Sequence, residues 1–90
     1  MSDLAAWLES AFPMDLGSGH RASWLVSEGG RNLMTWHPNC SAKANSRWVD
    51  LVSGTHHRLI SEDPLHIEPS LLCEFCGDHG FIRDGRWVPA

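Results

Sequence analysis

Two short clusters of cysteine and histidine constrain this 90-residue chain more than any other feature. The first spans residues 37–40 (His-Pro-Asn-Cys) and the second spans residues 73–79 (Cys-Glu-Phe-Cys-Gly-Asp-His). Two ligands three positions apart at the tip of a turn can chelate one ion, and Gly77 relieves crowding where backbone N–H groups turn toward thiolates. The spacing therefore predicts a structural zinc (Zn2+) site.

Five side chains compete for the four positions of a tetrahedral zinc ion. The cysteines are the firmest candidates, because thiolates bind zinc well. The fourth position stays open between two histidines, one at x2 spacing before the first cysteine and one at x2 spacing after the last. The 32 residues between the clusters leave room for two or three strands, so two turns at one end of a small sheet could meet at one ion, as in zinc ribbons. The candidate metal ligands are Cys40, Cys73, Cys76, His79 and His37.

The length of the chain makes a metal important for stability. A domain of this size buries only roughly 60–65% of the surface that its unfolded chain exposes. Net stabilities of domains are about 5–15 kcal/mol, whereas zinc binding in zinc-finger peptides contributes about 10–16 kcal/mol. We therefore expect metal binding and folding to be coupled.

Composition and charge narrow the compartment and the partners. The start of the chain is acidic and no apolar run reaches the roughly 18 residues of a membrane span, so we expect a cytoplasmic protein without membrane contact. Three cysteines in such a setting favour metal-bound thiols over disulfides. The net charge of −4 argues against a nucleic-acid partner. The five tryptophans are expected to lie mainly in the core.

The hydrophobic pattern predicts an α+β, mostly β fold in a single domain over residues 1–90. A short helix over about residues 3–12 would be capped by Ser2 and would pack an apolar stripe on the domain. A flexible link over residues 15–20 would lead into a β-rich zinc domain over about residues 20–90. The stripe consists of Leu4, Trp7, Leu8 and Phe12.

Short β-prone runs predict one small antiparallel sheet stapled by a zinc-ribbon-like site. Glycines at 29 and 30 separate the first two runs, and Asp84-Gly85 is a turn favoured in type I′ hairpins. The run at 57–60 is expected to pair back across the run at 47–52. The expected strands cover residues 22–26, 33–36, 47–52, 57–60, 65–67, 80–83 and 86–88.

Catalytic arrangements are weak in this sequence. Glu74 and Asp78 fall in no H-x-E or H-E-x-x-H pattern and are expected to be solvated. Residues 65–69 around His66 look superficially like the core of HNH nucleases. However, Leu65 precedes the histidine where Asp or His is usual, and only six residues separate His66 from Cys73. A metal-dependent enzyme such as a small HNH-like nuclease is therefore the alternative rather than the leading hypothesis.

The last third of the chain resembles a family of small, uncharacterised metal-binding proteins from phages, plasmids and bacteria. Their tails carry Pro-Ser, C-x-x-H, an aromatic-Ile pair, a basic residue, an Asp/Asn-Gly turn and a terminal Trp. The matching segments here are 69–70, 76–79 and 81–87. The resemblance implies that Cys76 and His79 are both ligands, but Cys73 is an extra thiol and His37 stands where the family has a cysteine. It transfers no activity.

The resulting hypothesis is a non-enzymatic protein-interaction module with a structural zinc ion. The resemblance and the small size add the expectation of a phage-encoded modulator that acts on a host protein in the host cytoplasm. A protein partner is expected, without nucleic acid and without a membrane.

Overall fold

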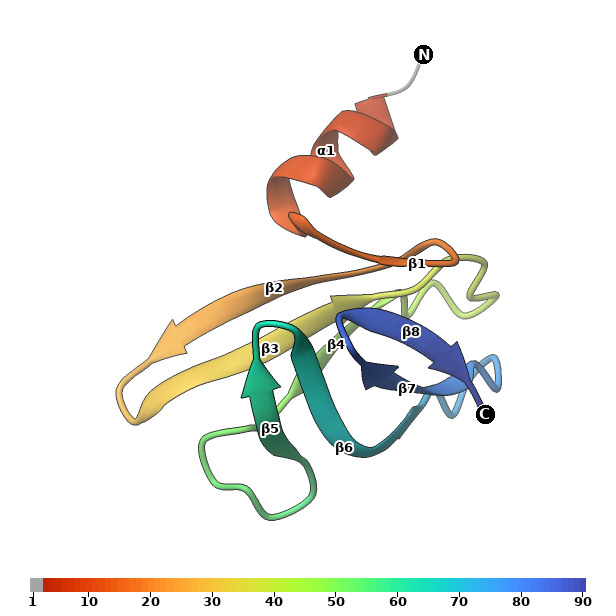
Figure 1. Ribbon diagram of the computed structural model, residues 1–90. Helices are drawn as coiled ribbons and strands as arrows, with labels where there is room; N and C mark the ends of the chain where they lie inside the picture. Colours follow the sequence, from red (N-terminus) through yellow and green to blue (C-terminus); the bar gives the residue numbers. More distant parts are fainter. Residues whose placement is uncertain (1–2) are drawn as a thin grey trace.

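The computed structural model describes residues 3–90, which form one short helix followed by eight strands (Figure 1). The strands make two four-stranded antiparallel sheets with the orders β1-β2-β3-β4, here the N-terminal sheet, and β5-β6-β7-β8, the C-terminal sheet. The mostly β class with one N-terminal helix is therefore confirmed. The elements are α1 (Asp3–Ala11), β1 (Met14–Gly17), β2 (His20–Ser27), β3 (Gly30–Trp36), β4 (Ser46–Val49), β5 (Arg58–Glu62), β6 (Leu65–Leu72), β7 (His79–Arg83) and β8 (Arg86–Pro89).

The two sheets share one hydrophobic core. Inward positions of the strands alternate with outward ones, as a sheet with one buried face requires. In both sheets the inward side chains belong to the same cluster of buried residues, so each sheet covers the apolar face of the other. The core cluster consists of Leu16, Ala22, Leu33, Val49, Leu65, Ile67, Leu71, Ile82 and Trp87.

The division into two sheets corrects the expectation of one. The run at 57–60 does not pair back across the preceding run; β5 pairs with β6 instead, with Leu59 opposite Ile67. This register sets the partly buried Leu59 beside the fully buried Ile67. Turn signals alone could not distinguish the two pairings, because both are antiparallel and local.

The hairpins predicted at Gly29-Gly30 and at Asp84-Gly85 are confirmed. Ser27 pairs with Gly30 at the end of the β2–β3 hairpin, and Arg83 pairs with Arg86 around the Asp84-Gly85 turn. The φ angles of Asp84 and Gly85 are 52° and 72°, which is the left-handed region that a type I′ turn needs at both central positions.

The link expected over residues 15–20 is wrong. Residues 14–17 form β1, which joins β2 through a tight turn, and Asp15 pairs with Arg21. Leu16 is only 2% exposed, so its burial in the core orders a segment that its glycines made look flexible. β6 is also longer than predicted and runs through Pro69, next to an irregularity in its pairing with β7, where a proline is tolerated.

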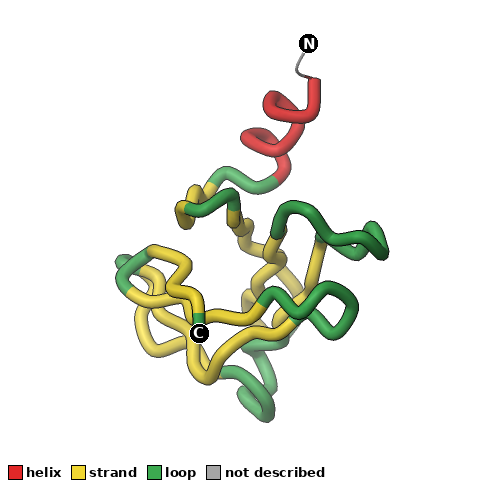
Figure 2. Tube along the Cα trace, turned by 90° about the vertical axis from the view of Figure 1, so that its right-hand side faces the viewer, coloured by secondary structure: helices red, strands yellow, loops and turns green. Residues whose placement is uncertain are grey.

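Helix α1 stands apart from the body of the molecule in both views (Figures 1 and 2). It has no buried residue: Leu4 is 61% and Trp7 is 51% exposed. The predicted packing of the stripe on the domain is therefore wrong for the helix itself, although Phe12 just after it is buried. The proposed cap Ser2 lies outside the described residues. Within residues 3–90, no helix has the length and the apolar character of a membrane span.

The tryptophans are also less buried than expected. Trp87 is in the core, whereas Trp24 and Trp36 are half-buried and Trp7 and Trp48 are exposed. Trp24 packs against the core with part of its surface, and the Arg31 guanidinium carbon lies 4.4 Å from its ring centroid. The number of tryptophans therefore overestimates how many aromatic side chains this small protein buries in its core.

Gly80 on β7 provides a test of this packing. A Cβ atom at position 80 would lie 2.6 Å from Trp87 Cζ2 and 2.7 Å from the backbone oxygen of Val88. We expect Gly80→Ala to lower the free energy of unfolding by about 1–3 kcal/mol in a urea titration, since the neighbouring strand must shift. Gly29→Ala is the control, because its added Cβ would meet a single Val52 methyl group, at 2.7 Å, and this exposed side chain can rotate away whereas the backbone oxygen of Val88 cannot. Equal stabilities of the two variants would contradict the described β7–β8 packing.

Candidate metal centre

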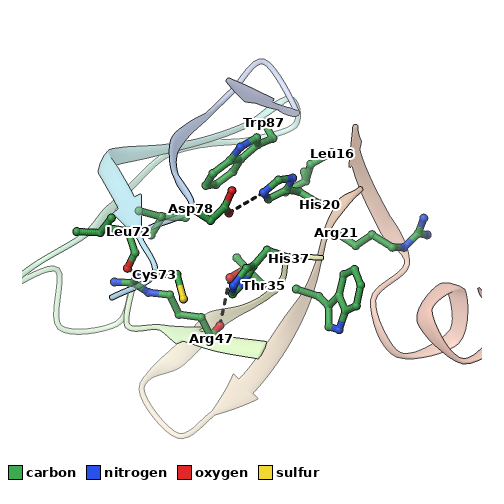
Figure 3. A pocket seen from close by; sticks show the side chains of 12 residues that line it. Leu16, His20, Arg21, Thr35, His37, Arg47, Leu72, Cys73, Asp78 and Trp87 are labelled. Carbon is green, nitrogen blue, oxygen red and sulfur yellow. Dashed lines mark hydrogen bonds and ion pairs between the residues drawn. The ribbon is translucent and has the colours of Figure 1, made fainter. Parts of the chain in front are cut away.

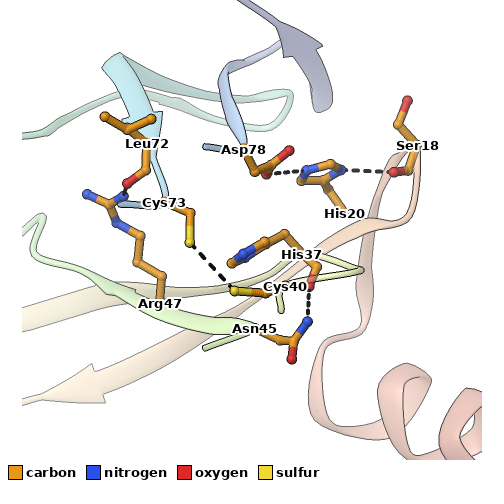
Figure 4. A network of polar contacts seen from close by, with 9 residues as sticks. All are labelled: Ser18, His20, His37, Cys40, Asn45, Arg47, Leu72, Cys73 and Asp78. Carbon is orange, nitrogen blue, oxygen red and sulfur yellow. Dashed lines mark hydrogen bonds and ion pairs between the residues drawn. The ribbon is translucent and has the colours of Figure 1, made fainter. Parts of the chain in front are cut away.

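Four of the five predicted ligands come together at one place. Each of them offers one ligand atom, and these atoms all lie within 4.8 Å of one another. Figure 4 shows three of the four residues, His37, Cys40 and Cys73. Two of the residues follow β3 and two follow β6, so the group joins the two sheets. This arrangement could hold a metal ion such as zinc. The members are His37, Cys40, Cys73 and Cys76.

The first pair is held by a loop that folds back on itself. The backbone N–H of His37 donates to the Asn45 carbonyl at 2.9 Å, and the Asn45 side-chain amide donates to the His37 carbonyl at 2.7 Å. Asn39 has a φ of 59°, a left-handed conformation that asparagine tolerates better than most residues. The turn brings His37 and Cys40 to the same side, where both are buried.

The second pair lies on a tight turn between β6 and β7. The N–H of Gly77 donates to the Cys73 carbonyl, and the N–H of Cys73 donates to the Asp78 carbonyl, each at 2.8 Å. Gly77 has a φ of 79°, so a glycine is favoured at the turn as the sequence suggested. Burial decreases along this turn, from the half-buried Cys73 to the exposed Cys76.

The distances and the donor set fit a tetrahedral ion. Zinc–sulfur bonds of about 2.3 Å in a tetrahedron place two sulfurs about 3.8 Å apart. The Sγ atoms of Cys40 and Cys73 are 3.9 Å apart. In addition, Nε2 of His37 is buried without a hydrogen-bond partner. A buried polar atom left unpaired costs free energy, and coordination of an ion would remove that cost.

The thiols are prepared unequally for metal binding. Hydrogen bonds from the backbone N–H groups of Cys76 and Phe75 lower the pKa of Cys73 to about 6, so its thiolate forms at neutral pH. The N–H of Asp78 favours the thiolate of Cys76, but desolvation together with the neighbouring Cys73 and Cys40 outweighs it and raises the pKa of Cys76. Like charges this close oppose a second ionisation, which a divalent cation would relieve.

His79 is not part of this group. Its Nε2 lies 2.9 Å from the Ser70 hydroxyl oxygen, and its side chain is exposed. As the first residue of β7 it pairs with Leu72, so its position is set by the sheet rather than by the turn. The ligand role that the resemblance implied for His79 is therefore not what the geometry favours; His37 completes the group.

A second interaction between the sheets was missed by sequence reasoning. Asp78, expected to be solvated, has its Oδ2 2.7 Å from Nε2 of His20 on β2, and Nδ1 of the same ring lies 2.9 Å from the Ser18 carbonyl oxygen (Figure 4). The His20 ring also stacks on Trp87, with a distance of 4.1 Å between the ring centroids and an angle of 9° between the ring planes. The aspartate thus ties the Cys73–Cys76 turn to the N-terminal sheet. No local pattern links residues 58 positions apart.

Arg47 on β4 makes a further contact between the two sheets, next to the cluster. Its guanidinium donates to the Leu72 carbonyl, and its side chain lies next to Cys73 (Figures 3 and 4). Three thiolates around a divalent cation carry a net negative charge, which a nearby guanidinium partly offsets.

Two hollows border the cluster. The wider one has a volume of about 320 Å³ and is lined by His37, Cys73, Glu74 and Phe75 among others. The cavity in Figure 3 is bordered by His20, His37, Asp78 and Trp87 and has a volume of about 20 Å³, which is room for a single water molecule. Of the residues weighed for catalysis, His66 lies elsewhere, with its Nε2 3.1 Å from Glu68 Oε2 on β6. Glu74 is exposed and lines the wider hollow.

No protein-family profile, no curated protein and no solved structure matches this chain.

Proposed function

We propose that this protein is a small zinc-stabilised module that acts by binding another protein and not by catalysis. The observation that carries the proposal is helix α1, an amphipathic helix with no buried residue. The cluster of His37, Cys40, Cys73 and Cys76, here called the metal group, supports a structural role for zinc. The exposed helix supports a role for the protein in binding a partner.

The donor set favours zinc among the metals that such a group could hold. Three sulfurs and one imidazole nitrogen form the closed Cys3His set of structural zinc sites. Catalytic zinc keeps an open position for water, and a group that supplies four protein ligands leaves none. The proposed role of the ion is therefore to hold the loop after β3 against the turn after β6.

The apolar stripe of α1 stays largely exposed in the described part of the chain. Isolated helices shorter than about 12–15 residues are marginal in water, and α1 has 9 residues. Leu4 and Trp7 are more than half exposed, although both lie on its apolar stripe. A partner with a hydrophobic groove would bury this stripe in the way that many amphipathic helices are recognised.

The resemblance of the tail adds the proposed setting, namely the cytoplasm of a bacterial host in which a phage-encoded protein would meet a host protein. The nuclease alternative has no specific support, because the side chains of His66 and Glu68 contact each other and neither belongs to the metal group.

Site-specific photo-crosslinking tests the interaction proposal. A benzophenone amino acid at position 7 should capture one bacterial protein at a stoichiometric level from lysate, whereas the same probe at position 26 should not. Val26 is a matched control, because it is 78% exposed but lies on the β2 strand, away from the helix. The captured protein should be lost when Leu4→Ser is added. Capture of nothing, or equal capture from both positions, would contradict the role of α1.

A further inference from the structure

The arginines of the two sheets differ in whether their guanidinium groups have a hydrogen-bond acceptor within the described part of the protein. Each arginine of the N-terminal sheet donates to a protein acceptor: the Phe12 carbonyl, the Glu62 carboxylate or the Leu72 carbonyl. Within residues 3–90, no arginine of the C-terminal sheet has a carboxylate oxygen within 4.0 Å. The partnered set is Arg21, Arg31 and Arg47, and the unpartnered set is Arg58, Arg83 and Arg86.

Two of the unpartnered arginines border one groove on the outer face of the C-terminal sheet. Arg58 reaches it from β5 and Arg83 from β7, and the groove has a volume of about 300 Å³. Phe81 and Arg83 face outward because Ile82 between them is buried in the core. Pro69 and Phe81 supply an apolar part of the lining, and the Arg83 guanidinium carbon lies 4.1 Å from the Phe81 ring centroid.

We propose that this groove binds an oxyanion, a carboxylate or a phosphate, attached to a flat apolar group. Guanidinium groups present several N–H donors in a plane that matches carboxylate and phosphate oxygens. Arg58 and Arg83 would hold the oxyanion, and the apolar group would lie against Pro69 and the part of Phe81 that the Arg83 guanidinium does not cover. The groove is remote from α1 in the fold, so this binding activity is separate from the proposed contact through the helix.

The charges around the groove limit the size of the ligand. Glu68 also lines it, with its carboxylate 3.1 Å from Nε2 of His66. The whole chain carries a net charge of −4. A long polyanion needs an extended basic face, which this protein lacks, whereas a single oxyanion needs only the two guanidinium groups. Glu68 opposes that oxyanion and so sets an upper limit on its affinity.

Phenyl phosphate is the probe for this site, titrated into the zinc-loaded protein and followed by amide and arginine NMR shifts. We expect saturable shifts at Phe81 and at the two arginines. Arg58→Gln and Arg83→Gln should each weaken binding about tenfold, as loss of one charge-assisted hydrogen bond does. Glu68→Gln should strengthen it several-fold. Lys43→Gln is the matched control, because it also removes one positive charge, but from an exposed side chain on the loop after β3.

The proposal is overturned if phenyl phosphate gives no saturable shifts, or if Lys43→Gln weakens binding as much as the arginine variants. Inorganic phosphate should bind more weakly than phenyl phosphate, and equal binding would overturn the role assigned to Pro69 and Phe81. The spectrum of each variant reports whether it is folded. Phosphotyrosine within a short Gly/Ser peptide then identifies the source of the ligand: tenfold tighter binding than phenyl phosphate assigns a protein segment, and equal binding assigns a free small molecule.

Discussion

Removal of the metal ion is expected to unfold this protein. Zinc binding contributes about 10–16 kcal/mol in zinc-finger peptides, which equals or exceeds the typical net stability of about 5–15 kcal/mol of a domain. Without the ion, three thiols and a buried imidazole nitrogen without a partner remain between the two sheets. Circular dichroism in the presence of a chelator should lose its β signal, and tryptophan fluorescence should shift to the red as Trp87 becomes exposed.

Native mass spectrometry gives the stoichiometry that this prediction needs. One zinc ion per chain is expected before chelation and none after it, and added zinc should restore the β signal. Magnesium is the control, because it prefers oxygen ligands and should not restore the fold. A metal-free protein that still unfolds in one cooperative transition would contradict the coupling between metal binding and folding. The core shared by the two sheets would then be enough to keep the protein folded.

Replacement of His37 is expected to have the second largest effect. His37→Ala removes the proposed nitrogen ligand and leaves a cavity at a side chain that is 6% exposed. Changes in residues that only support a ligand already weaken metal affinity 10–100-fold, so loss of a ligand should weaken it by more than about 100-fold. A competition titration with a chromophoric chelator measures this change directly, in the purified protein at neutral pH.

His79→Ala is the matched control, since it also removes an imidazole close to the Cys73–Cys76 turn. Its only described side-chain contact is with Ser70, at an exposed position, so its zinc affinity should match that of the wild type and its stability should change by less than about 0.5 kcal/mol. If His79→Ala released the ion and His37→Ala did not, the ligand set implied by the resemblance would be correct.

The residues of the candidate centre could be named from the sequence, but the choice between two histidines could not. Cys-x-x-Cys spacing acts within one turn, so Cys73 and Cys76 were identifiable without any knowledge of the fold. His37 and His79 have equivalent spacing from their nearest cysteines. What separates them is that β7 begins at His79 and directs its ring to Ser70, whereas the loop closed by Asn45 turns His37 inward.

The burial of the helix and of the tryptophans was the least predictable property. An amphipathic pattern shows which face of α1 is apolar, but not whether a partner surface in the same chain covers it. Trp7 and Trp48 have the same chemistry as Trp87, and only the position of Trp87 on an inward face of β8 places it in the core. The pairing of His20 with Asp78 likewise depends on the way the two sheets face each other.

The sequence by itself determined the features that act over a few residues: the N-terminal helix, the Asp84-Gly85 hairpin, the mostly β class and the two cysteine-containing turns. Each of these depends on local conformational preference or on ligand spacing, which neighbouring residues settle. Only the tertiary structure decided that the strands form two sheets, that the metal group joins them and that Asp78 meets His20. These features depend on contacts between distant residues, whose free energy comes from burial in a core that forms only when both sheets are in place.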